Sequence, residues 1–265
     1  MRMRLKSVIL ALIFSISAAH ANRPIIVWDI HDVLLQPYDQ FVTLLKFPHL
    51  RNIFSHISWP LIKHTGSLLL QHFSREVSSE EYIHMAIENG NPHLAELIVS
   101  IANAQRPITG MRSIVQELHN LGIEQHIGSN IGKTSFYRLL DKQKYPQIAA
   151  LLKYMNLEKS VVSKFIDGSV IKKPDVRFFE RYLTKNSIDF KKQHVIFIDD
   201  RWDNVRVARA MGFDGILFKN PNQLRNELHK RAIPIRIPSS RYTNQRDRHS
   251  LRDTSRFYRS INSIV

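Results

Sequence analysis

The stretch Ile25-Ile26-Val27-Trp28-Asp29-Ile30-His31-Asp32 decides the fold, because four consecutive apolar residues run directly into three titratable side chains. An unbroken apolar run of this length is typical of a strand that is buried on both faces of a parallel sheet. The sequence therefore predicts a buried strand at 25–28 that delivers Asp29 at its carboxyl end.

Two further runs of this kind also lead into polar residues at their carboxyl ends. The run from Glu124 to Gly128 leads to Ser129-Asn130, and the run from His194 to Ile198 leads to Asp199-Asp200. A helical pattern follows each of the three runs, at 111–121, 175–183 and 204–211. Strands that alternate with helices predict an α/β protein with a doubly wound, Rossmann-like parallel sheet, in which ligands bind at the carboxyl ends of the strands.

Residues 37–105 differ from the rest, because they show helical patterning and no convincing strand. We interpret this insertion as a helical cap over the α/β core, which would comprise 22–36 and 106–229; such lids exclude water from reacting groups. The cap holds six histidines, at 49, 56, 64, 72, 84 and 93. No pair of them has the short spacing of a metal-ligand motif, so we interpret them as ordinary polar positions.

The two ends of the chain have their own compositions. Residues 1–21 combine a basic start, a short apolar stretch and Ala19-His20-Ala21, which is typical of a secretory signal peptide. We expect cleavage after Ala21 and a secreted or periplasmic protein, and the sequence offers no other segment that could span a membrane. Residues 230–265 form a basic tail with nine Lys or Arg and two Asp, which suits a solvated extension or an anion-binding arm.

Charge and cysteine content narrow the chemistry. The 265 residues carry a formal net charge of +15 and include no cysteine. Disulfide scaffolds, thiolate zinc sites and cysteine nucleophiles are therefore excluded, and catalysis must come from carboxylate, hydroxyl, imidazole, amine or bound metal. A carboxylate at a strand end, such as Asp29, can attack phosphorus or carbon and form a covalent aspartyl intermediate.

Four motifs occur in a fixed order along the chain: Asp29-Ile30-His31-Asp32-Val33-Leu34, Ser129-Asn130, Lys173-Pro174-Asp175, and Asp199-Asp200-Arg201-Trp202-Asp203-Asn204. In this order they resemble the motifs of the haloacid dehalogenase (HAD) superfamily of hydrolases, over roughly residues 24–225. The resemblance implies a phosphatase-like enzyme with a helical cap.

The resemblance assigns the nucleophile and a metal site. Asp29 would form the aspartyl-phosphate intermediate, and Mg²⁺ would be the cofactor. Its ligands would be the carboxylates of Asp29, Asp199 and Asp200, with Asp200 the more direct of the acidic pair, and the backbone carbonyl of His31. Carboxylate and carbonyl oxygens are the ligands that Mg²⁺ prefers.

The remaining residues would bind the phosphoryl group. Lys173 would stabilise its charge and that of Asp29, while Ser129 and Asn130 would hold its oxygens. A small-molecule phosphate ester is the expected substrate, and nothing in the sequence requires a nucleic acid.

His31 departs from the pattern, because phosphatases of this superfamily carry a second Asp there that acts as general acid and base. Three interpretations stay open: His31 acts as the acid and base, turnover is slow while metal binding survives, or the protein is a catalytically inactive phosphate- or metal-binding protein. Asp32 stands where glycine is usual. Dehalogenation is a further alternative, although the acidic pair Asp199-Asp200 favours the metal-dependent phosphatases.

Overall fold

A computed structural model describes residues 23–37, 79–88, 90, 92–166 and 169–237. The expected signal peptide at 1–21, cap residues 38–78 and the tail from 238 onward lie outside the described residues. The chain divides into two compact units, Met1–Pro221 and Asn222–Val265. Within the described residues, no helix is long and apolar enough to cross a membrane.

The first unit is built on a six-stranded sheet with the order β6-β5-β4-β1-β7-β8. Its strands are β1 (Ile25–Trp28), β4 (Glu124–Gly132), β5 (Val161–Ile166), β6 (Ser169–Ile171), β7 (Val195–Asp199) and β8 (Asp214–Leu217). All neighbours pair in parallel except β5 and β6, which pair antiparallel. The predicted α/β class and mostly parallel sheet are therefore confirmed.

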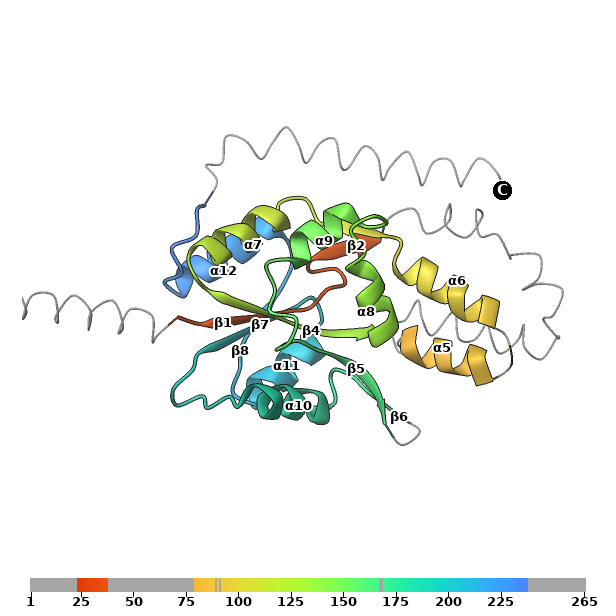
Figure 1. The fold of residues 1–265 in the computed structure, drawn as a ribbon. Coiled ribbons are helices and arrows are strands. Elements are labelled where there is room, and N and C mark those ends of the chain that lie inside the picture. The colour runs from red at the N-terminus through yellow and green to blue at the C-terminus, as the bar shows by residue number, and fades with distance from the viewer. Residues whose placement is uncertain (1–22, 38–78, 89, 91, 167–168, 238–265) are drawn as a thin grey trace, which may run out of the picture. The chain divides into compact units, whose positions relative to one another are not determined.

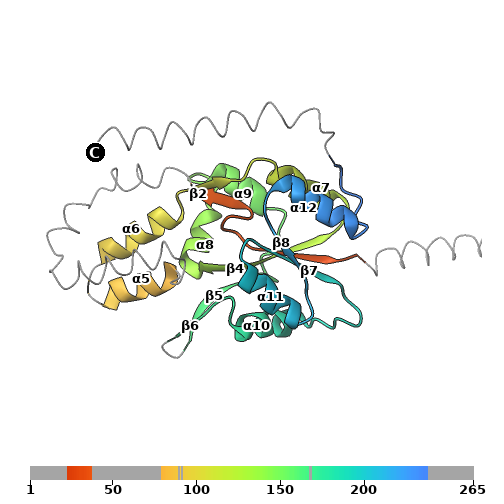
Figure 2. The ribbon, with the colours of Figure 1, turned by 180° about the vertical axis from the view of Figure 1, so that it is seen from behind.

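Helices cover both faces of the sheet. In Figures 1 and 2, α7 (Met111–Asn120) and α9 (Pro146–Leu152) lie on one face, and α10 (Val176–Asn186) and α11 (Trp202–Ala210) lie on the other. A short helix, α8 (Lys133–Leu139), follows β4 directly. The second unit contains α12 (Pro221–Lys230), apart from its first residue.

An aromatic cluster anchors α10 to the sheet. The ring of Phe179 on α10 lies 5.4 Å from that of Phe197 on β7 and 5.8 Å from that of Phe213, both in edge-to-face geometry. Rings in this arrangement add about 0.5–1.5 kcal/mol per pair to the burial of their surface. Because α10 begins shortly after Lys173, this packing fixes the segment that carries the lysine.

The described part of the insertion is helical, with α5 (Ser79–Glu88) and α6 (Pro92–Ala102) packed on each other. Two short strands that the sequence did not predict, β2 (Leu35–Pro37) and β3 (Gln105–Pro107), pair antiparallel at its two ends. The chain therefore leaves and re-enters the core at one place. Helix α5 also contacts α8, β4 and β5.

A buried histidine on β4 gives a pH-dependent stability. His126 is fully buried; its Nδ1 lies 2.6 Å from the Tyr182 hydroxyl and its Nε2 lies 3.1 Å from Glu124 Oε1. Burial lowers the pKa of His126, and this outweighs the opposing effect of Glu124. The unfolded chain therefore binds more protons at this residue than the folded chain does, once the pH falls below the ordinary histidine pKa of about 6.5.

We expect the free energy of unfolding to fall by up to about 1.4 kcal/mol per pH unit below pH 6.5, until the lowered pKa of the folded state is reached. Urea titrations between about pH 7.5 and 5 would measure this slope. His126→Gln should flatten it, whereas the same change at the exposed His229 should leave it intact. An unchanged slope in His126→Gln would show that other groups cause the pH dependence.

Candidate active site

Two carboxylates meet where β1 and β7 end. Asp29 follows β1 directly, and Asp199 is the last residue of β7. The strands are neighbours in register, and the Asp29 N–H donates to the Ile198 carbonyl at 2.9 Å. The two side chains are therefore brought together as the sequence predicted, although each is almost completely removed from solvent.

The side chain of Lys173 bridges these two carboxylates. Its Nζ lies 3.0 Å from Asp29 Oδ1 and 2.6 Å from Asp199 Oδ2, and the residue is only 2% exposed. The ammonium also lies 5.3 Å from the centre of the Phe197 ring, within the range of a cation–π contact. Lys173 is thus a rigid cation at the carboxyl end of the sheet.

The protonation of Lys173 follows from its neighbours. Burial lowers the pKa of the amine, but the charges and hydrogen bonds of Asp199 and Asp29 outweigh burial and raise it above its ordinary value. Burial also raises the pKa of the Asp199 carboxyl, and the Lys173 ammonium opposes that rise. The lysine therefore stays charged across the neutral pH range.

Asp199 is held by more than the lysine. The Asn204 side-chain amide donates to both of its oxygens, at 2.9 and 3.1 Å, and the Arg201 N–H donates to Oδ1 at 2.8 Å. Asn204 was not predicted as a site residue from the sequence. Its position in the first turn of the helix that follows the acidic pair is the signal that could have identified it.

The Asn130 side chain binds the lysine segment. Its Nδ2 donates to the Lys173 carbonyl at 2.8 Å, and its Oδ1 accepts from the Lys173 N–H at 2.7 Å. The Lys173–Pro174 peptide bond is cis. Both polar atoms of the Asn130 amide are thus engaged with the protein, so its side chain positions Lys173.

Ser129 lies inside β4, and the prediction that this strand ends at Gly128 is wrong. The strand continues to Gly132, with a shift in its pairing to β5 between Ser129 and Gly132. The irregularity bends the strand at its carboxyl end, which is typical of strands beside functional sites. Ser129 is fully buried, and its Oγ accepts from the Ile131 N–H at 3.4 Å.

The turn after Asp29 explains why glycine is usual at position 32. Asp32 has a φ of 57°, in the left-handed region, and its N–H donates to the Leu35 carbonyl at 2.6 Å. Aspartate tolerates this region better than most residues with a side chain. His31 is half-buried, and its backbone pairs with Leu35 within the same turn.

A third carboxylate completes an oxygen cluster. Carboxylate oxygens of Asp29, Asp199 and Asp200 lie within 4.8 Å of one another. Two of the three carboxylates, those of Asp29 and Asp199, also bind the Lys173 ammonium. An all-oxygen, anionic donor set of this kind fits Mg²⁺.

No family model matches the chain, but individual proteins do. It is 29% identical over 111 residues to the sesquiterpene phosphatase astK of Aspergillus oryzae, covering 42% of this chain and 50% of the relative. It is 38% identical over 65 residues to the drimenol cyclase drtB of Aspergillus calidoustus, covering 24% of this chain and 12% of that protein. The chain thus spans half or less of the length of these curated relatives.

Solved structures share the fold. A HAD-like hydrolase from Porphyromonas gingivalis matches with a TM-score of 0.51 and 14% identity, over 81% of this chain and all of that chain. The HAD phosphatase from Thermococcus onnurineus matches with a TM-score of 0.50 and 14% identity, over 74% of this chain and 86% of that chain. The resemblance read from the four motifs is confirmed at the level of the fold: the described core has the α/β fold of HAD-like hydrolases.

Proposed function

We propose that the protein is a Mg²⁺-dependent phosphomonoesterase that acts on a small-molecule phosphate ester. The observation that carries this proposal is the Lys173 ammonium held between Asp29 and Asp199, with Asp200 in reach of both carboxylates. A buried carboxylate nucleophile beside a fixed cation and a divalent metal site suits the transfer of a phosphoryl dianion. The similarity to a phosphatase and to HAD phosphatases supports it.

Asp29 is the nucleophile in this proposal. Its Oδ1 accepts hydrogen bonds from the Ile30 N–H at 2.8 Å and from Lys173 Nζ. Oδ2 accepts none from the described residues and is therefore the oxygen placed to attack. A bond forms between Oδ2 and phosphorus, the bond from phosphorus to the ester oxygen breaks, and that oxygen leaves as an alcohol once it is protonated.

Positive charge is the main requirement of this step, because the nucleophile and the phosphate are both anionic. Lys173 supplies part of it at a fixed position, since Asn130 holds its backbone and Asp199 holds its ammonium. We assign the phosphate oxygens to Lys173, the Ser129 hydroxyl and backbone N–H groups near Asn130. Mg²⁺, held by Asp29, Asp199, Asp200 and the His31 carbonyl, would supply charge neutralisation between nucleophile and phosphate.

His31 is our candidate for the acid and base. Its imidazolium would donate a proton to the leaving oxygen, and the neutral imidazole would then accept a proton from the water that attacks phosphorus and releases Asp29 and orthophosphate. Histidine is a common general acid and base in enzymes, which suits both halves of this role. The phosphatases that the four motifs resemble carry an aspartate in this position, and that side chain serves as their general acid and base.

His31→Asp should therefore raise turnover of alkyl phosphates about tenfold or more, with little change for aryl phosphates, whose leaving groups need less protonation. The measurement is kcat for one alkyl and one aryl phosphate with wild type and variant. His31→Asn, which removes the imidazole without adding an acid, is the matched control and should slow alkyl esters. If His31→Asp leaves the alkyl rate unchanged, protonation of the leaving group does not limit turnover.

The substituted acid favours one other candidate function, a protein that binds phosphate or metal without turnover. A screen of the full chain against sugar, nucleotide and aryl phosphates, with Mg²⁺ and with EDTA, separates the two. Phosphate release that requires Mg²⁺ supports the phosphatase. Calorimetric binding of Mg²⁺ or phosphate with no release from any ester supports the binding protein.

We also propose that the protein is exported, on the composition of residues 1–21 alone. Expression of the full chain in a bacterial host with intact export should give a mature protein whose amino terminus is Asn22. Peptide mass mapping of that protein measures the cleavage site. Recovery of an intact Met1 terminus from the periplasmic fraction would contradict cleavage after Ala21.

A further inference from the structure

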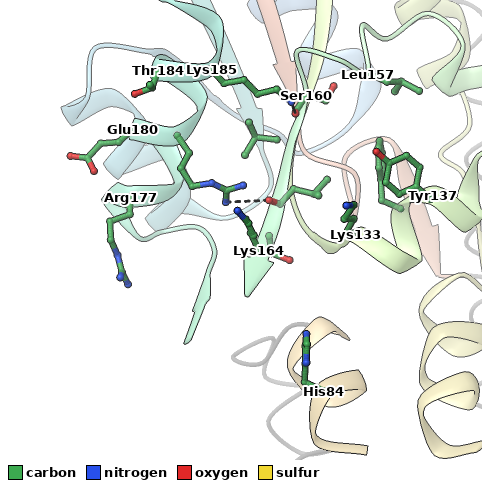
Figure 3. A pocket seen from close by; sticks show the side chains of 15 residues that line it. His84, Lys133, Tyr137, Leu157, Ser160, Lys164, Arg177, Glu180, Thr184 and Lys185 are labelled. Carbon is green, nitrogen blue, oxygen red and sulfur yellow. Dashed lines mark hydrogen bonds between the residues drawn. The ribbon is translucent and has the colours of Figure 1, made fainter. Parts of the chain in front are cut away.

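The first unit also has a cavity that is separate from the candidate active site. Its volume is about 820 Å³, and it is lined by residues from α10, β5, α8 and α5 (Figure 3). None of Asp29, Lys173, Asp199 and Asp200 lines it. Pockets of roughly 300–1,000 Å³ are the usual size for small-molecule ligands.

The charged side chains of this cavity are mostly cationic. The formally cationic ones are Lys133, Lys164, Arg177, Arg181 and Lys185, and Glu180 is the acidic one among the described lining residues. In Figure 3, Glu180 and Arg177 lie together at one side, away from Lys133 and Lys164. Arg177 is bound to Asp175 through its guanidinium, so its charge is already balanced. The others make the cavity a cationic groove.

Two of these cations bind backbone carbonyls of β5 and the residue before it. Arg181 donates to the Val162 carbonyl at 3.4 Å, and Lys185 donates to the Ser160 carbonyl at 2.8 Å. These contacts occupy backbone acceptors of the strand, which keeps them from pairing with other chains. A neutral carbonyl does not balance a positive charge, however, so these two hydrogen bonds leave the charges of Arg181 and Lys185 uncompensated.

The two cations also disfavour each other. Burial lowers the pKa of Arg181, and burial together with the Arg181 charge lowers the pKa of Lys185, while Glu158 acts in the opposite direction. An anion in the groove would relieve this repulsion. Lys133 and Lys164 are exposed and form no ion pair within the described part of the chain, so they too are available to a ligand.

The positions of the cations indicate the shape of the ligand. The Lys185 ammonium binds the Ser160 carbonyl, and Lys164 lies four residues farther along the chain on β5, so the backbone positions 160 and 164 are about 13 Å apart at the rise of a strand. A ligand with several anionic groups in a row matches cations spread along such a span better than a single phosphate does. Tyr137, which is 60% exposed, adds an aromatic ring to the wall on α8.

We propose that this cationic groove is a second binding site, for a small molecule that carries an oligophosphate chain. The chain of anionic groups would lie along β5 between Lys185 and Lys164, with the organic part toward Tyr137. The proposal does not rest on the phosphatase function.

The groove is nevertheless joined to the catalytic segment. Ser163, in its lining, donates through Oγ to the Asn130 carbonyl at 3.1 Å and to the Ile131 carbonyl at 3.0 Å. The Asn130 amide in turn holds the backbone of Lys173. Hydrogen bonds through Ser163 and Asn130 therefore connect the cationic groove to the segment that carries Lys173, although the two sites use different side chains.

Inorganic triphosphate and inorganic phosphate are the probes, titrated calorimetrically into the full chain with EDTA at about 0.15 M NaCl, where long-range surface charge is screened. We expect triphosphate to bind at least about tenfold more tightly than phosphate, because it reaches cations along the whole groove. Lys133→Gln/Lys164→Gln changes two exposed side chains and should weaken triphosphate about tenfold without a change in the rate with an aryl phosphate. Glu180→Gln should tighten it.

The matched control is Lys191→Gln/Lys192→Gln, which removes the same charge from two exposed residues outside the groove. It should change the triphosphate affinity less than about twofold. An equal loss in the control would overturn the proposal in favour of general surface charge, as would equal affinity for phosphate and triphosphate. Tighter binding of a polyglutamate peptide than of triphosphate would also overturn it, since the groove would then serve an acidic protein.

Discussion

Asp29→Asn is expected to lower phosphate release by at least about a thousandfold, because an amide cannot attack phosphorus and form the aspartyl intermediate. The substitution keeps the size of the side chain, and the amide oxygen that it introduces can still accept hydrogen bonds from the Ile30 N–H and from Lys173. The fold should therefore survive. The measurement is kcat/KM of the full chain with Mg²⁺ and an aryl phosphate.

The same Asp→Asn change at Asp189, whose side chain is 44% exposed and which precedes the amino end of β7, is the control and should leave the rate unaltered. Thermal unfolding of both variants confirms that they fold. Retention of more than about a tenth of the activity in Asp29→Asn would require a different nucleophile, and the assignment of Asp29 would fail.

Lys173→Met should give the largest loss of stability. It leaves the carboxylates of Asp29 and Asp199 buried side by side without the ammonium that lies 3.0 and 2.6 Å from them. Removing one partner of a buried ion pair typically costs about 3–5 kcal/mol of unfolding free energy. We expect a loss of that size at neutral pH, measured by urea titration, together with the loss of phosphate release.

A second substitution separates charge from packing. In Lys173→Met/Asp199→Asn, one of the two uncompensated charges is removed, and we expect a substantial part of the lost stability to return. Addition of Mg²⁺ should also stabilise Lys173→Met more than it stabilises the wild type, since a cation would replace the missing charge. Lys192→Met, at an exposed site, should change stability by less than about 0.5 kcal/mol. If the double variant is no more stable than Lys173→Met, the loss comes from packing around the lysine stem.

The parts of the fold that the sequence predicted are those with a strong pattern of apolar residues. The runs that became β1 and β7 are apolar at consecutive positions because both of their faces are buried, and the helix that became α7 has regular apolar spacing up to Gly122. Such patterns follow directly from burial.

The strands that the sequence did not predict are short or interrupted. β8 (Asp214–Leu217) has four residues, one of them a glycine, and β5 carries Ser163 and Lys164 among its apolar residues. β2 and β3 have three residues each and acquire their pairing only because the insertion closes on itself. Local propensity cannot reveal a strand whose partner lies some 70 residues away.

The candidate active site was likewise only partly predictable from the sequence. Parallel strands place their carboxyl ends at one edge, which was enough to predict that Asp29 and Asp199 meet, whereas Lys173 was placed with them by the family resemblance. That the Asn130 amide holds the backbone of Lys173 depends on the exact placement of two segments 43 residues apart, which no local pattern encodes. The cationic groove is likewise assembled from four separate elements.

We expect Asp29 to carry the phosphoryl group during turnover. The most direct measurement is an acid quench of the full chain during hydrolysis of an aryl phosphate with Mg²⁺, followed by proteolysis and mass spectrometry. We predict a phosphorylated peptide with the group on Asp29, which should be absent from Asp29→Asn and from samples with EDTA. Steady phosphate release with no phosphoryl group on Asp29, or with the group on another residue, would contradict it.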